Sequence, residues 1–143
     1  MSTSGTIRAI TRNLQKVLQG LGIYYSVKAS DDAKDLAASN IPVGEIQYEG
    51  EGFEDAFGQR PGYIDAGFAI KVLFVTRSHA DIVREQQDWT HKIRSALTVD
   101  ALNSDELSLG KNVSRVTILK AEAVNRKNIS SINLKINIRY RTD

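Results

Sequence analysis

The last fifteen residues of the chain alternate between apolar and polar side chains. Every second residue from Ile132 to Tyr140 is apolar, and the residues between them are Asn, Lys or Arg. A period of two places successive side chains on opposite faces of a β-strand. The pattern therefore predicts a strand over 129–141 with one face on the core and a row of cations on the other.

Two segments show the helical period instead. Apolar residues from Ile7 to Leu21 are spaced by three and four positions, which predicts an amphipathic helix over 6–20. A second stripe predicts a helix over 79–96, with Trp89 in the core and with Ser78 and Asp81 at capping-box spacing. Its members are Ile82, Gln86, Trp89, Ile93 and Leu97.

Four further strands and one short helix complete the predicted elements. The strands cover 23–29, 43–48, 63–76 and 113–124, and the helix covers 98–107 with Thr98 as its cap. We expect 63–76 in the middle of the sheet, 43–48 at an edge, and 113–124 in an antiparallel hairpin with 129–141 through a loop at 125–128. Glycines and acids over 50–62 predict a flexible loop.

This order of elements predicts an α+β fold in a single domain, residues 1–143. We expect an antiparallel or mixed β-sheet of about five strands, with two main helices packed on one face. The chain of 143 residues is long enough to bury a conventional core, and 41% of its residues are hydrophobic.

Charge is distributed unevenly along the chain. Residues 31–65 contain nine acids and two bases, whereas 111–143 contain eight bases and two acids. If these segments lie on opposite flanks of the fold, identical copies would attract head to tail, which is the contact that closes into rings. The alternative is that both segments are solvated faces of one sheet.

The residue types of catalytic and metal sites do not occur in a productive spacing. The absence of cysteine excludes disulfides, thiolate catalysis and cysteine-bound metals. His79 and His91 would lie about 18 Å apart on one helix, too far to share a metal. Ser78, His79 and Asp81 fit a helix start better than a catalytic triad. We therefore expect no enzyme, no cofactor and no metal, and we expect neither a secretory signal nor a membrane span.

The remaining candidate residues suit contacts with other proteins. Phenylalanines in the predicted glycine-rich loop would either fold back onto their own sheet or anchor another protein. The final strand adds cations, which could also touch DNA without sequence specificity, because no recognition helix or interleaved aromatic residues accompany them. The predicted interaction residues are Phe53, Phe57, Arg60, Lys135, Arg139 and Arg141.

Two segments resemble the tail terminator (tail completion) proteins of long-tailed bacteriophages. They are the helix that leads into a tyrosine-rich strand (IRAITRNLQKVLQGLGIYYSV) and the final basic strand (INLKINIRYRTD). The resemblance implies a tail-terminator-like fold and a structural virion protein that forms a ring, usually a hexamer, at the head-proximal end of the tail tube. Such a ring ends tube polymerisation and joins the tail to the neck.

The implied partners are other copies of the chain, the tail tube protein, a neck or head-completion protein, a sheath protein if the tail has one, and the DNA that passes through the ring. The implied location is the virion, after assembly in the cytoplasm of a bacterial host. Two alternatives stay open. One is another neck or head-completion ring protein, and the other is a small α+β ligand-binding or enzymatic domain with a pocket between its helices and its sheet.

Overall fold

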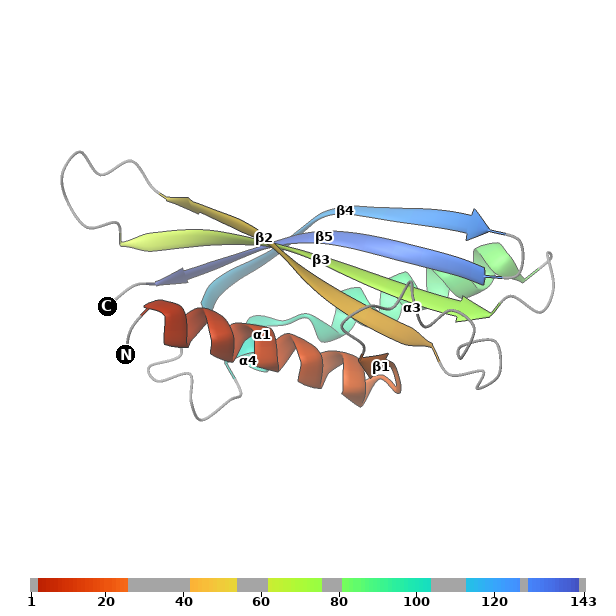
Figure 1. Ribbon diagram of the computed structural model, residues 1–143, viewed down its shortest axis with the longest axis horizontal. Helices are drawn as coiled ribbons and strands as arrows, with labels where there is room; N and C mark the ends of the chain where they lie inside the picture. Colours follow the sequence, from red (N-terminus) through yellow and green to blue (C-terminus); the bar gives the residue numbers. More distant parts are fainter. Residues whose placement is uncertain are drawn as a thin grey trace.

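The computed structural model describes residues 3–25, 42–53, 62–75, 81–103, 113–126 and 129–141. Two main helices lie beneath one face of a twisted five-stranded sheet, which confirms the predicted α+β fold (Figure 1). The elements are α1 (Thr3–Gly20), β1 (Tyr24–Tyr25), β2 (Val43–Phe53), β3 (Tyr63–Val75), α3 (Ile82–Ala96), α4 (Val99–Leu102), β4 (Val113–Arg126) and β5 (Ile129–Arg141).

The sheet is mixed, with the strand order β1-β2-β3-β5-β4. The short strand β1 runs parallel to β2 and pairs with it only at Val43 and Gly44. The three other neighbouring pairs are antiparallel. Strand β3 has a partner on both sides, as its continuous apolar sequence predicts, and β4 and β5 form the predicted antiparallel hairpin.

The core fills the space between the helices and the sheet. Alternate residues of β3 and β5 face it, and most are completely buried, including Phe68, Leu134 and Tyr140. The predicted stripe of α1 packs against them through Ile10, Leu14 and Leu18, while Ile93 of α3 joins the same cluster. Trp89 is half-buried and packs on this cluster, as its place on the stripe predicts.

Polar contacts tie the helices to one another and to the sheet, and one of them caps α4. The side-chain amide of Asn13 in α1 is completely buried and donates to the carbonyl of Leu102 in α4 over 2.7 Å. Thr98 caps α4 as predicted, because its hydroxyl accepts a hydrogen bond from the amide of Ala101. The buried Gln86 of α3 donates to Oδ1 of Asn125 in β4 over 2.8 Å.

Several predicted boundaries were wrong. Helix α1 begins at Thr3, three residues early, and β2 continues to Phe53, so 50–53 belong to a strand and not to the expected loop. Strand β4 continues to Arg126 and takes the first half of the predicted hairpin loop. The remaining parts of the predicted elements and loops lie outside the described residues: 26–29, 54–61, 76–80, 104–107 and 127–128. Helix α3 begins at Ile82, and Asp81 makes no side-chain cap bond.

A β-bulge at Glu49 explains why the apolar and polar alternation that predicts the first half of β2 stops before its second half. Tyr48 pairs with Phe68 and Glu51 pairs with Ala66, so both lie on the core side although they are three residues apart. One extra residue in the strand reverses the alternation. Gly50 permits this with a φ of 106°, a conformation that side chains disfavour.

Candidate functional site

The sheet face that points away from the helices is the outer face, and polar side chains dominate it. In β5 it carries Asn133, Lys135, Asn137, Arg139 and Arg141, which confirms the predicted wet side of the final strand. Residues in register with these positions face the same way. Lys71 of β3 pairs with Asn133, and Glu45 of β2 pairs with Lys71. Gln47 of β2 is on the same face, because it pairs with the β3 residue opposite Lys135.

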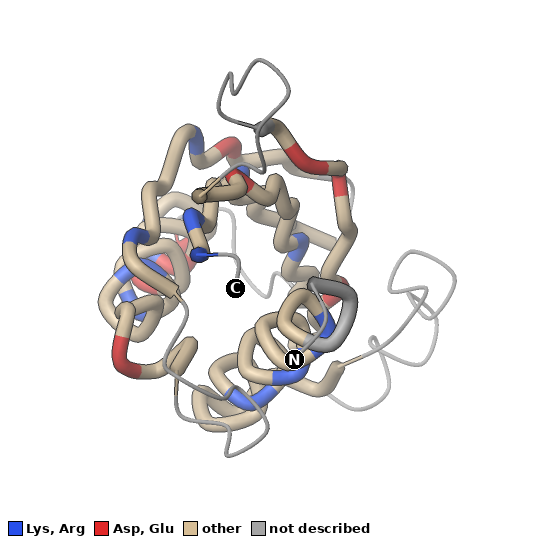
Figure 2. Tube along the Cα trace, turned by 90° about the vertical axis from the view of Figure 1, so that its left-hand side faces the viewer, with Lys and Arg blue, Asp and Glu red and all other residues tan. Residues whose placement is uncertain are grey.

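Charge changes sign across this sheet from one edge to the other. Strand β2 contains three acids and no base, and β3 contains one acid and one base. Strand β5 contains three bases and no acid, and β4 contains three bases and one acid. Since β2 and β4 lie toward opposite edges, the acidic strand β2 and the basic strand β4 occupy opposite flanks of the described sheet, and the charged positions can be followed along the trace in Figure 2.

Strands β4 and β5 form the basic half of the sheet, and in two places they set one cation directly opposite another. Arg115 of β4 is opposite Arg139 of β5, and Lys120 is opposite Lys135. Like charges directly across an antiparallel pair destabilise a sheet. An acidic partner would relieve this repulsion, and internal acids relieve it only in part: Glu122 forms an ion pair with Lys120, and Asp65 forms one with Arg139.

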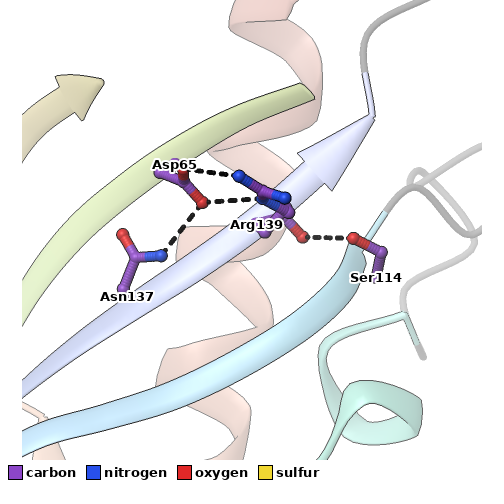
Figure 3. Close-up of polar contacts among 4 residues, drawn as sticks. All are labelled: Asp65, Ser114, Asn137 and Arg139. Carbon is purple, nitrogen blue, oxygen red and sulfur yellow. Dashed lines mark hydrogen bonds and ion pairs between the residues drawn. The ribbon is translucent and has the colours of Figure 1, made fainter. Parts of the chain in front are cut away.

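The Asp65 contacts form the best-defined polar network of the outer face (Figure 3). Arg139 donates from Nε and Nη2 to the two carboxylate oxygens of Asp65, each over 3.1 Å, and the amide of Asn137 donates to Oδ1 over 3.0 Å. The hydrogen bonds from Arg139 lower the pKa of the Asp65 carboxyl, and Asn137 adds to this against the opposite effect of partial burial. The guanidinium of Arg139 also lies 5.6 Å from the ring centre of Tyr63.

The six predicted interaction residues differ in exposure and in whether the structure describes them. Lys135 and Arg141 are exposed on the outer face, whereas Arg139 is half-buried and bound to Asp65. The backbone of Phe53 pairs with Ile64 at the end of β2. Phe57 and Arg60 lie outside the described residues, and a role in protein contacts stays a prediction for all six.

Sequence reasoning missed the individual residues of the two edges. Arg115 and Lys120 contributed only to a segment charge, and Glu45 and Glu49 contributed to a segment charge and to the polar side of the strand predicted over 43–48. The alternation of Glu45 and Glu49 within β2 was an available signal, whereas the bulge between Ile118 and Lys120 hides the common face of Arg115 and Lys120 in β4. Strand order was the missing information, because only the sheet shows that these residues stand toward opposite edges of one face.

A hollow of about 470 Å³ lies where α1 leads into β1. Two further hollows in the described part of the chain lie beside the long strands of the sheet. One occupies the outer face, has a volume of about 320 Å³ and is lined by charged residues of all four long strands, among them Glu45, Lys71 and Lys135. The other, of about 510 Å³, lies between α3 and β4. Neither lies between the main helices and the middle of the sheet, where a ligand pocket was considered and where the core cluster packs instead.

The part of the chain that the structure describes contains no group of three or more His, Asp or Glu side chains placed to hold a metal ion. His91 is exposed on α3, and His79 lies outside the described residues. Within the described helices, none has the length and apolar content needed to cross a bilayer.

Comparison with known proteins gives matches among solved structures. No protein-family model matches the chain, and no curated protein matches it. A solved structure with a similar chain is "Virion of native gene transfer agent (GTA) particle", with a TM-score of 0.45 and 18% sequence identity over 99% of both chains. Function therefore has to be argued from the surfaces of this chain.

Proposed function

We propose that this chain is a structural protein of a phage-like virion, whose copies form a ring, a hexamer by resemblance, at the head-proximal end of a tail tube. The ring ends tube growth and joins the tail to the neck. The observation that carries the proposal is the placement of an acidic strand and a basic strand toward opposite edges of one sheet. Such a subunit attracts its own copies head to tail, and contacts of this kind form a ring when the rotation between neighbouring copies closes.

The sequence resemblance supports the same proposal. The first segment covers most of α1 and all of β1, and the second covers most of β5, the strand between β3 and β4. Under this proposal the partners are the tail tube protein, a neck or head-completion protein and a sheath protein if the tail has one. DNA would pass through the ring without specific contacts.

The test is electron microscopy of the purified protein mixed with growing tail tubes of the same virion. We expect rings at one end of each tube and a shorter, narrower distribution of tube lengths. An unchanged length distribution would contradict termination. Rings that bind an isolated head connector and leave tubes bare would instead assign the chain to the neck.

A further inference from the structure

In the described part of the chain, both edges of the sheet have backbone groups that pair with no other strand. Among the described strands, β2 beyond Gly44 pairs only with β3, and β4 pairs only with β5. The four long strands alternate in direction and are even in number. The β2 strand of a second copy in the same orientation would therefore run antiparallel to β4 of the first, and the sheet could continue from copy to copy.

The charged residues of the two edges have the same spacing. Glu45 and Glu49 lie four residues apart on β2. Arg115 and Lys120 lie five residues apart on β4, but a bulge between Ile118 and Lys120 absorbs one residue, so they stand opposite Arg139 and Lys135, which are four residues apart. Each pair of like charges therefore spans about 14 Å along its edge.

We infer that the edges of neighbouring copies pair in one register, with Glu49 of one copy opposite Arg115 of the next and Glu45 opposite Lys120. This inference rests on the proposed ring and names its subunit contact. The antiparallel direction fixes the order of the two ion pairs, because the reverse assignment would require parallel strands. Each glutamate then meets one of the two like-charge pairs of the basic half.

The same register has a consequence on the core side of the sheet. Tyr48 is 50% exposed at the β2 edge, although it faces the core side and its ring contacts Phe68 at 5.6 Å between centroids. In the inferred register, Tyr48 lies opposite Val116, a half-buried residue that packs on the core of the next copy. The contact would cover an exposed aromatic ring as well as neutralise charge.

Charge reversal with exchange of partners tests the register. One variant carries Glu45→Lys and Glu49→Lys, and the other carries Arg115→Glu and Lys120→Glu. Each alone should bind its own copies about tenfold more weakly than wild type, or worse, in sedimentation velocity at low salt. An equal mixture should recover oligomers in which the two variants alternate, and this recovery also shows that both variants are folded. Self-association of either variant at wild-type strength, or a mixture that stays dissociated, would overturn the inference.

Disulfide trapping gives a second test, which is clean because the chain has no cysteine. Gln47→Cys with Thr117→Cys joins exposed outer-face residues that the register places opposite each other. Oxidation should give a ladder of linked oligomers. Gln47→Cys with Ala121→Cys is the matched control, since Ala121 is exposed on the same strand but four residues away and on the other face. Equal linking of both pairs, or of the control pair alone, would refute the register.

The two proposals can fail separately. Rings that seat on tail tubes without trapping the Gln47–Thr117 pair would preserve the proposed function and overturn the register. Trapped closed oligomers that leave tube lengths unchanged would support the register and contradict termination.

Discussion

The hydroxyl of Tyr140 donates a hydrogen bond of 2.8 Å to Oε1 of Glu51, across the intervening strand β3. Tyr140 is completely buried near the end of β5, and Glu51 reaches it because the bulge at Glu49 turns the second half of β2 toward the core side. The contact ties β2 to β5, the strand that carries three of the six predicted interaction residues.

Replacement of Tyr140 by phenylalanine should lower the free energy of unfolding by about 1 kcal/mol, because a half-exposed carboxylate loses its hydrogen-bond donor and regains water only in part. Urea denaturation at neutral pH measures the effect. Tyr24→Phe is the control, since the Tyr24 side chain is 66% exposed and should change stability little. Equal effects of the two substitutions would argue against a stabilising Tyr140–Glu51 contact.

The same hydroxyl should make stability depend on alkaline pH. Burial, and then the hydrogen bond to Glu51, raise the pKa of Tyr140 above its ordinary value of about 10. The folded state therefore keeps a proton that the unfolded state loses, so this contribution is complete below about pH 10 and declines as the pH rises further. Urea unfolding measured from about pH 9 to about pH 11 should show that the free energy of unfolding declines more steeply for wild type than for Tyr140→Phe.

Gly50→Ala should destabilise the protein by about 1–2 kcal/mol, because a Cβ atom disfavours the φ of 106° at the bulge. Gly52→Ala in the same strand is the matched control: neither position has an atom within 4 Å of the added Cβ, but only Gly50 has a positive φ. Thermal unfolding of the two variants separates backbone strain from the general effect of adding a methyl group.

Asp65→Asn should lower the free energy of unfolding by about 1 kcal/mol at neutral pH, a modest value because both partners of the Asp65–Arg139 pair are partly exposed. Arg139 depresses the pKa of Asp65 in the folded state, so the contribution is present above the ordinary carboxyl pKa and is lost as the pH falls through the folded value. Chemical denaturation at neutral and strongly acidic pH should therefore show a difference that disappears in acid. A difference that persists there would assign the effect to packing.

Asn13→Ala should cost about 2 kcal/mol, since it removes a buried donor and leaves the carbonyl of Leu102 without its 2.7 Å hydrogen bond. Gln19→Ala is the control on the exposed side of α1. Hydrogen exchange of the α4 amides should rise in the Asn13 variant and not in the control, because Asn13 joins α1 to α4.

Local periodicity predicted most elements because each depends on neighbouring residues. The alternation from Ile132 to Tyr140 predicted β5 within its observed bounds, and the stripe of α3 predicted its buried residues Ile82, Gln86 and Ile93. The alternation of apolar and polar residues failed to predict the strand where a bulge adds one residue to it. At Glu49 the alternation reversed, and a glycine-rich segment that predicted a loop continued as the end of β2.

The sequence by itself determined the α+β class, the apolar faces of its helices and strands, and the opposite charges of residues 31–65 and 111–143, because side-chain spacing and composition are local properties. Only the tertiary structure decided that β5 inserts between β3 and β4, that Glu51 meets Tyr140, and that the acidic and basic strands stand toward opposite edges of one face. These relationships join residues up to 89 positions apart. They follow from strand order and register, which the packing of the whole core selects and no single segment encodes.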